Sequence, residues 1–330
     1  MLRSFKITAT LLVAALCPSI TQGDGAMDHV LEVHGSGTTN PSKCIWLLQQ
    51  QIQDRTRVPI HMTYRAVGSS TGIYEFLGVN NTGDFTYLNY NDFASADIPL
   101  PQEDYQTLSD LNIGIIQLPF LIGSVGVFYN SLTDTDNHLS DFAADAQPTV
   151  NLTACDVAKI FRRKITKWDD EELLPNNPNL RKVLPSDVEH PPIHVARRVL
   201  GSSSTASLTA YLNAACPSEW PAELVGTTIE WPEDTMECEG SAGMSACLVE
   251  TPGAIGYMES GHGWAENFKE VELKNANGRF LSSRKAAANG GIASALQEFP
   301  DSADKDFSSV NLINKVITFC LLSFNYSARV

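Results

Sequence analysis

Three loops rich in glycine, serine and threonine carry the side chains of this sequence that could bind an anion. Residues 35–40 read Gly-Ser-Gly-Thr-Thr-Asn, residues 68–72 read Gly-Ser-Ser-Thr-Gly, and residues 201–205 read Gly-Ser-Ser-Ser-Thr shortly after an arginine pair. Each loop follows a strand-like run and precedes a helix-like one. Such a turn presents unpaired backbone N–H groups, hydroxyl donors and the positive end of a helix dipole at one place. Three of them in one chain predict a site for an oxyanion.

The segments around these loops predict the elements that position them. Residues 30–34, 60–67 and 193–196 have the apolar or alternating pattern of strands. The helices that follow are expected to bury apolar stripes, which are Cys44, Ile45, Leu47, Leu48 and Ile52 after Pro41, then Ile73, Phe76 and Leu77, then Leu208, Tyr211 and Leu212. Strands alternating with helices predict an α/β fold with parallel or mixed sheets, in which ligands bind at the carboxyl ends of strands.

Other segments predict further elements of the same fold. Residues 113–118 and 125–130 are expected to be two strands, with a proline and a glycine between them. Thr153 predicts a helix N-cap, with Asp156 at the third helical position and an inner stripe of Val157, Ile160 and Phe161. The apolar run 316–324 predicts a buried strand or a short core helix, because a membrane-spanning helix needs about 18 apolar residues.

Composition and charge exclude several classes of protein. The chain has 330 residues, of which 43% are hydrophobic and 18% charged, and this composition is that of a folded protein with room for two domains. The formal net charge is −15, and no Lys/Arg-rich arm is present. Because nucleic-acid binding depends on clustered cations that neutralise phosphates, DNA and RNA are excluded as partners. The densest basic cluster, residues 162–164 with Lys167, is expected to be a solvated helix end.

The first residues have the pattern of a secretory signal peptide. Arg3 and Lys6 form a positive start, residues 11–16 an apolar centre, and Pro18 ends it before a small residue that suits cleavage ahead of Asp24. We therefore expect residues 1–23 to be a signal peptide and the mature chain to be secreted or of periplasmic type.

An oxidising compartment would allow disulfides and, in a eukaryotic host, glycosylation. Six cysteines follow the signal segment, and they can pair into three disulfides in 15 ways. The sequence favours only one pair, Cys238–Cys247, because these two cysteines are close along the chain. Sequons for N-glycosylation begin at Asn80, Asn151 and Asn325.

Three motifs in the sequence offer alternatives to the anion site. Residues 68–72 also fit the Gly-x-Ser-x-Gly elbow of serine hydrolases, with Ser70 as nucleophile, but this interpretation leaves the other two loops and Arg198 without a role. His190 and His194 flank two prolines, which forbid the helix that would place both rings on one metal ion. Residues 35–40 lack the Gly-Lys-Ser/Thr end of a nucleotide-binding loop. No metal and no cofactor is expected.

Ordered blocks along most of the chain resemble a known family, the phosphate-binding proteins of bacterial high-affinity phosphate transporters, called PstS-like. The blocks are residues 35–41, 64–70, 96–100, 117–130, 164–170, 197–212 and 252–257. The resemblance implies a two-lobed periplasmic-binding-protein fold of type II, with the ligand in a cleft between the lobes. It implies a non-enzymatic, monomeric protein that captures inorganic phosphate for uptake or scavenging, with a membrane phosphate transporter as a partner.

The resemblance also implies where the lobes and the ligand contacts lie. Lobe one would comprise residues 24–120 plus 260–330 and lobe two residues 121–259, with crossings near Pro119 and Tyr257. The phosphate contacts carried over by position are Thr38, Thr39, Asn40, Ser69, Asp97, Arg198, Ser202, Ser203 and Ser204.

The proton that phosphate carries explains why a carboxylate, Asp97, would stand at an anion site. Near neutral pH phosphate still carries an O–H, which Asp97 can accept, whereas fully ionised sulfate would meet the carboxylate lone pair to lone pair. Specificity is then expected to come partly from repulsion of the wrong ligand.

The sequence departs from the family pattern at three places. Leu200 stands where an aspartate usually holds the arginine, so Arg198 is expected to lose that partner. Ser203 replaces a glycine and adds bulk, and the portion after about Asp301 is short and divergent. These departures, with the sequons, keep one rival function open, a cell-surface interaction module that has the same fold and has lost its ligand.

Overall fold

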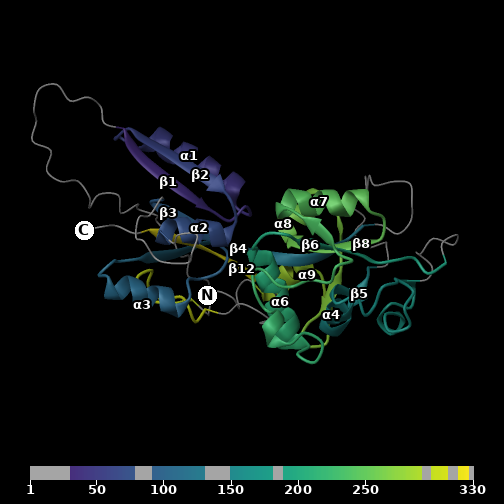
Figure 1. Ribbon diagram of the computed structural model, residues 1–330. Helices are drawn as coiled ribbons and strands as arrows, with labels where there is room; N and C mark the ends of the chain where they lie inside the picture. Colours follow the sequence, from purple (N-terminus) through teal and green to yellow (C-terminus); the bar gives the residue numbers. More distant parts are fainter. Residues whose placement is uncertain are drawn as a thin grey trace, which may run out of the picture.

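The elements of this protein form two groups that are joined by long central strands. The structure, a computed structural model, describes residues 30–78, 91–130, 149–180, 189–291, 299–310 and 319–326. The expected signal peptide and the sequon at Asn80 lie outside the described residues. Figure 1 shows one group of helices and strands on each side, with β4 and β12 between them. No helix in the described part of the chain has the length and apolarity needed to cross a membrane.

A mixed sheet runs through both groups. Its strands are, in spatial order, β2 (Ile60–Ala66), β1 (Leu31–Gly37), β3 (Phe93–Ala96), β12 (Phe319–Tyr326), β4 (Ile116–Tyr129), β8 (Ala254–Glu259), β6 (His194–Arg198) and β7 (Met236–Cys238). Neighbours are parallel at both ends of this order, whereas β12 is antiparallel to β3 and β4, and β4 is antiparallel to β8. The predicted α/β class with mixed sheets is confirmed.

The first group packs three helices on the β2-β1-β3 end of the sheet. The helices are α1 (Ser42–Arg55), α2 (Ser69–Leu77) and α3 (Gln102–Asp110). The predicted stripe of α2 is confirmed, because its apolar side chains are buried against β3 and α3 in one cluster, which is Ile73, Phe76, Leu77, Ala94, Ala96, Leu100 and Leu108.

The predicted stripe of α1 is wrong at most of its positions. Ile45 is buried with Tyr64 and Phe93, but Cys44, Leu47 and Leu48 are exposed. The helix packs on β2, the edge strand of the sheet, so only one narrow face of it is covered. The periodicity of an apolar stripe does not say how wide a surface the sheet offers.

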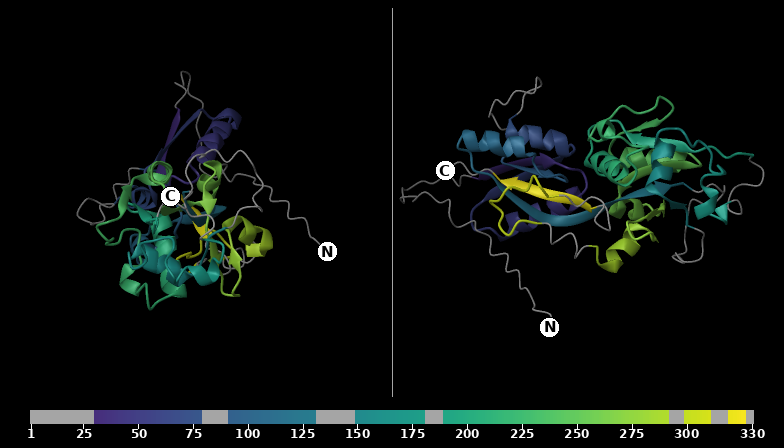
Figure 2. Two further views of the ribbon diagram at one scale, coloured as in Figure 1. Left: turned by 90° about the vertical axis from the view of Figure 1, so that its right-hand side faces the viewer. Right: turned by 90° about the horizontal axis from the view of Figure 1, so that it is seen from below.

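The two strands expected at 113–118 and 125–130 are one continuous strand, β4. Its first part pairs with β12 and its last part with β8. Pro119 is tolerated inside it because the pairing with β12 shifts register between Leu322 and Ser323, which lies opposite the proline. A proline lacks the N–H that a regular ladder needs and is therefore found at such irregularities. β4 and β12 lie side by side along most of their length (Figure 2, right).

The second group contains the larger core and most of the short elements. These are β5 (Asn151–Leu152), α4 (Ala154–Phe161), α6 (Ser203–Ala215), α7 (Gly240–Glu250), α8 (Ser260–Ala265), β9 (Lys269–Glu270), β10 (Glu272–Lys274), β11 (Phe280–Leu281), α9 (Ser283–Ala286), the 3-10 turns Leu174–Asn176 and Ala222–Leu224 and a π-helical turn Ala287–Gly291. Its largest fully buried side chains include Phe128, Phe161, Trp168, Trp220 and Tyr257.

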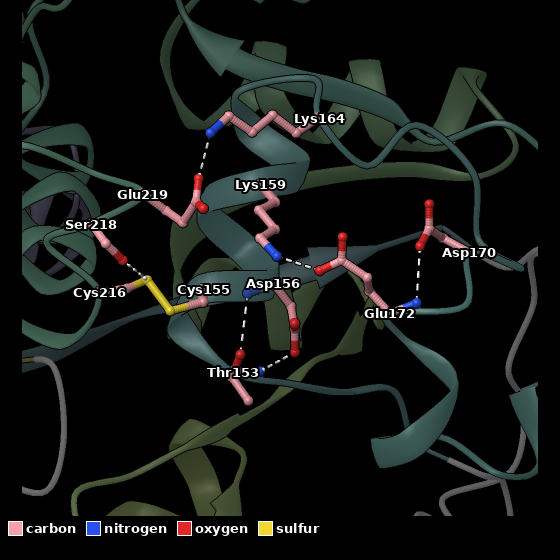
Figure 3. A network of polar contacts seen from close by, with 10 residues as sticks. All are labelled: Thr153, Cys155, Asp156, Lys159, Lys164, Asp170, Glu172, Cys216, Ser218 and Glu219. Atoms are coloured by element: carbon pink, nitrogen blue, oxygen red, sulfur yellow. Dashed lines mark hydrogen bonds and ion pairs between the residues drawn. A yellow bond between two sulfur atoms is a disulfide. The ribbon is translucent and has the colours of Figure 1, made fainter.

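The capping residues predicted for α4 and the predicted local disulfide are confirmed. The hydroxyl of Thr153 accepts from the Asp156 N–H at 3.1 Å while the Asp156 carboxylate accepts from the Thr153 N–H at 2.8 Å (Figure 3). Cys238 is bonded to Cys247, and a second disulfide, Cys155–Cys216, ties α4 to the end of α6.

Residues 260–286 lie with the second core, whereas the resemblance had placed them in lobe one. Val271 is buried in the larger core, β9 pairs with β4, and β10 pairs with β5. Tyr257, where a crossing was expected, is fully buried inside that core. The chain returns to the first group later, and its last described strand, β12, lies between β3 and β4.

Candidate functional site

The carboxyl ends of three parallel strands bring two of the predicted loops together. β1 lies between β2 and β3, and Gly37 at its end is opposite the last residue of β2 and the last but one of β3. Thr38 follows β1, Gly68 follows β2, and Asp97 follows β3. These three positions therefore share one edge of the sheet, as parallel strands require.

Two glycines allow the first two loops to touch. Gly37 has a φ of 151°, and its carbonyl accepts from the N–H groups of Val67 and Gly68 at 3.0 and 2.9 Å. The start of α2 lies so close that a Cβ on Gly72 would be 2.4 Å from the Cα of Gly37. Backbone cannot be displaced at that distance without moving the loops, so the absence of a side chain at position 72 holds them together.

The Asp97 carboxylate is the point on which the loops converge. Its Oδ2 accepts from the Thr38 hydroxyl at 2.5 Å, the Asn40 side-chain amide at 2.8 Å and the Ser69 hydroxyl at 3.3 Å. The same oxygen accepts from the hydroxyl of Ser203, which comes from the first turn of α6 in the second group. Asp97 is only 2% exposed. Donors from both groups therefore meet around one buried acid.

Burial gives this acid an unusual protonation equilibrium. Desolvation raises the pKa of Asp97 from 3.8 to about 7, the hydrogen bonds from Ser203, Thr38 and Ser69 lower it, and the negative charge of Glu259 raises it. Burial disfavours the charged form because the low-dielectric interior solvates it poorly. The Asp97 carboxyl therefore titrates near neutral pH.

Arg198 supplies a buried cation without the partner that the family pattern provides. Its side chain is 8% exposed, and its Nε has no hydrogen-bond partner among the described residues. The neighbouring Arg197 instead forms an ion pair with Glu237 at 2.6 Å. Leu200 is 56% exposed, so it contributes nothing that could hold Arg198. A buried guanidinium N–H that lacks a partner favours an anion beside it.

The start of α6 carries the remaining predicted serines. The Ser202 hydroxyl caps the helix by accepting from the Ser204 N–H at 3.2 Å, and the Ser202 N–H donates to the Thr227 carbonyl at 2.9 Å. The Ser204 hydroxyl donates to Glu259, whose other oxygen accepts from Ser241 at 2.7 Å. All three serines are buried.

Glu259 was missed by the sequence interpretation. It ends β8, a buried strand-like run, just as Asp97 follows the buried strand β3. Asp97 was predicted through the resemblance to the family, but an acid at the end of a buried strand is a local signal that both residues share, and it could have found Glu259.

The structure brings five of the nine predicted contact residues into direct contact and places three others close by in sequence and fold. Thr38, Asn40, Ser69, Asp97 and Ser203 meet directly, and Arg198, Ser202 and Ser204 lie at the adjoining ends of β6 and α6. Thr39 differs from these, because only its backbone carbonyl has a described contact, with the Ser42 hydroxyl at 2.9 Å. Ser203 was expected to add bulk, and its hydroxyl forms a hydrogen bond with Asp97 that joins the two groups.

Two of the histidines that could serve a hydrolase at Ser70 have other partners in the described structure. The ring of His190 contacts Asp169 at 2.7 Å, and the ring of His262 contacts Ser245 at 2.8 Å. Ser70 instead lies beside Gly201, where a Cβ on the glycine would be 3.5 Å from the Ser70 hydroxyl. Nucleophilic catalysis needs a base within hydrogen-bond reach of the hydroxyl, and neither of these two rings provides one.

Comparisons with known proteins agree with this architecture. Residues 20–311 match the family model described as the PBP superfamily domain. The chain is 25% identical over 276 residues to the phosphate-binding protein PstS of Methanocaldococcus jannaschii, which covers 82% of this chain and 64% of the relative. It is 28% identical over 251 residues to the PstS protein of Xylella fastidiosa strain 9a5c, covering 76% of this chain and 58% of the relative. The matches thus span less than two thirds of either relative.

Solved structures show the same fold at low sequence identity. The high-affinity periplasmic phosphate-binding protein PfluDING, bound with phosphate, superposes with a TM-score of 0.62 at 22% identity, covering 90% of this chain and 80% of that one. A phosphate-binding protein from Stenotrophomonas maltophilia gives a TM-score of 0.59 at 18% identity, covering 90% and 78%. The predicted two-lobed fold is confirmed, and the protein belongs to the PBP superfamily.

Proposed function

We propose that this protein binds inorganic phosphate between its two lobes, as a solute-binding protein that performs no catalysis. One observation carries the proposal, namely that side-chain donors from both groups of elements converge on Asp97, while the buried Arg198 ends the strand that precedes α6. The relatives named PstS and the phosphate-bound neighbour support the identity of the anion.

The chemistry of the site fits a protonated tetrahedral anion. An anion leaves water only where its oxygens find hydrogen-bond donors, which the hydroxyls of Thr38 and Ser69, the backbone around them and the Arg198 guanidinium would supply. Asp97 would accept the remaining proton of phosphate and repel a fully ionised sulfate. Local donors then outweigh the net charge of −15.

The lobes we propose follow the two groups of elements. Lobe one comprises residues 24–120 and the last strand, β12, while lobe two comprises residues 121–259 extended by 260–286, which pack on its core. Phosphate entry requires the Ser203–Asp97 contact between the lobes to open, after which the lobes close around the ligand, which takes the place of Ser203 at Asp97. The proposed binding step is therefore a closure of one lobe on the other.

The biological setting follows from the same proposal. A protein of this kind would be exported by residues 1–23, would act as a monomer outside the cytoplasm, and would deliver phosphate to a membrane transporter or retain it. Of the sequons, Asn151 is a poor acceptor in the folded state, because its side-chain amide donates to the Asn176 carbonyl at 3.2 Å.

Titration calorimetry on the mature chain, residues 24–330, tests the proposal. We expect saturable binding of phosphate and arsenate and much weaker binding of sulfate. A folded protein that binds none of the three anions at millimolar concentration would reject phosphate binding and favour the rival, an interaction module that has lost its ligand.

A further inference from the structure

Glu259 is a second, partly buried carboxylate that contacts the first turn of α6, as Asp97 does. It is the last residue of β8, which pairs with β6, the strand that carries Arg198. Its two oxygens accept from Ser204 on α6 and from Ser241 on α7. Its charge reaches Asp97, where it opposes ionisation of that carboxyl.

The first turn of α6 therefore offers two adjacent hydroxyls to two different carboxylates. Ser203 donates to Asp97, and Ser204 donates to Glu259. A serine hydroxyl has one proton to donate. While that proton is held by a carboxylate, the hydroxyl oxygen can only accept a hydrogen bond from a ligand. Ser204, which stays on Glu259, thus acts as an acceptor toward the ligand, whereas Ser203 is released when a ligand proton takes its place on Asp97.

We propose that Glu259 is a positioning residue that makes the site select the doubly protonated, singly charged form of its tetrahedral ligand, dihydrogen phosphate or dihydrogen arsenate. This inference rests on the proposed function. By holding the Ser204 proton, Glu259 leaves an acceptor that a second ligand O–H can satisfy, after Asp97 has taken the first. The ligand with two protons satisfies both acceptors, and the ligand with one proton satisfies only one.

Charge counting leads to the same ligand. The site holds two carboxylates, Asp97 and Glu259, against one buried cation, Arg198, whose Nε lacks a partner among the described residues. With Asp97 ionised, this site carries an excess of one negative charge, and a dianion would add two more. A monoanion adds half as much, and like charges in a buried site are costly because they are poorly screened.

Other ionisable groups do not replace Glu259 in this role. On the elements packed against β8 they are His194, Arg197 and Arg198 on β6, Tyr129 on β4, Tyr257 on β8, His262 on α8, Tyr211 on α6 and Glu250 on α7, together with Asp97 after β3. Arg197 is paired with Glu237, and the His262 ring contacts Ser245. Burial raises the pKa of Tyr257, so this phenol stays neutral.

Phosphate calorimetry as a function of pH tests the inference. In the wild type the apparent dissociation constant should rise about tenfold per pH unit above neutrality, and binding at alkaline pH should take up about one proton, measured in buffers of different ionisation enthalpy. Glu259→Leu and Glu259→Met, which leave no oxygen acceptor at position 259 for the Ser204 proton, should bind phosphate at alkaline pH with nearly constant affinity and little proton uptake. Glu250→Gln, which removes an exposed charge from the same lobe, should behave as the wild type.

The outcomes separate this inference from the proposed function. Phosphate binding that is independent of pH in the wild type, or an unchanged pH slope in folded Glu259 variants, overturns the role of Glu259 and leaves phosphate binding intact. If one variant does not fold, the other decides the question, because proton uptake by the wild type alone does not distinguish a proton on Asp97 from one on the ligand. Absence of phosphate binding by the wild type at every pH overturns both.

Discussion

At the scale of single residues, Asp97 is the centre of the proposed site. Side chains from both groups of elements donate to one of its oxygens, although the residue is an acid at a proposed anion site. The donors that hold the carboxylate are the ones a phosphate would need, so ligand binding is an exchange of partners at Asp97. Whether a ligand can replace these donors at Asp97 depends on whether the ligand brings a proton that the carboxylate can accept.

Replacing Asp97 by asparagine should narrow the preference for phosphate over sulfate. The amide no longer accepts the phosphate proton as a charged group and no longer repels sulfate, so the ratio of the two affinities should fall by at least about tenfold, since a charged hydrogen bond contributes roughly 1.5–3 kcal/mol. Calorimetry with both anions measures the ratio, and Asp110→Asn on the exposed end of α3 is the matched control. An unchanged ratio would disprove the proton-accepting role.

The same residue should make stability depend on pH. Burial raises the pKa of Asp97 from 3.8 to about 7, so between these values the folded state binds more protons than the unfolded state. The free energy of unfolding contributed by this group therefore falls as the pH rises through that window. In urea titrations without phosphate, Asp97→Asn should gain stability relative to the wild type as the pH rises from 3.8 to about 7. A difference that does not change with pH would contradict the buried titration.

At the scale of elements, close backbone contacts and cross-links hold the loops in place. The contact of α2 with the end of β1 depends on the missing side chain at Gly72. On the other side, the disulfide Cys155–Cys216 connects α4 with the end of α6, whose opposite end carries the serines of the site.

Gly72→Ala should separate the first two loops. A Cβ 2.4 Å from the Gly37 Cα forces the backbone apart, so we expect a loss of roughly 1–3 kcal/mol in unfolding free energy together with weaker phosphate binding. Gly114→Ala is the control, because a Cβ there meets nothing within 4 Å, and it should change stability by less than about 0.5 kcal/mol. Equal effects of the two substitutions in urea unfolding would rule out the proposed contact.

The two disulfides should contribute unequally. Their sequence separations are 61 and 9 residues, and the chain-entropy estimate for loops of these lengths is about 4.3 kcal/mol for Cys155–Cys216 and about 2.6 kcal/mol for Cys238–Cys247. Replacing each pair by serines and measuring urea unfolding checks the order. A larger loss for the Cys238–Cys247 pair would show that loop closure does not govern their contributions.

The elements that the sequence predicted well are those whose signals are local. The cap of α4 needs only Thr153 and Asp156, and the stripe of α2 needs only its own turns. The elements it predicted poorly depend on distant partners. β4 continues through Pro119 because β12, about 200 residues later, accommodates the irregularity. The exposed side chains of α1 follow from the position of β2 at the sheet edge.

At the scale of the whole molecule, β4 and β12 connect the two groups and Ser203 reaches across them to Asp97. The residues of the site were predictable because ordered blocks resemble a family, but the family pattern has glycine at the position of Ser203. Neither this contact between the lobes nor the Ser204–Glu259 contact could be predicted from spacing, since each joins residues that only the folded chain brings together.

Ser203→Gly should loosen the unliganded molecule. Without the hydroxyl, the described hydrogen bond from α6 to Asp97 is lost, so the lobes should separate more often and the radius of gyration from small-angle scattering should increase. Saturating phosphate should restore the compact form, whereas Ser203→Thr, which keeps the donor, should resemble the wild type throughout. Identical scattering of the wild type and Ser203→Gly without phosphate would contradict a role for this contact in closure.

A crystal structure of residues 24–330 grown with inorganic phosphate tests most directly whether the donors of both lobes form one anion site. We predict a phosphate within hydrogen-bond distance of Thr38, Ser69, Asp97, Arg198 and the first turn of α6, with one of its oxygens facing the Asp97 carboxyl. A phosphate bound elsewhere, or a fully occupied Asp97–Ser203 contact at saturating phosphate, would contradict it.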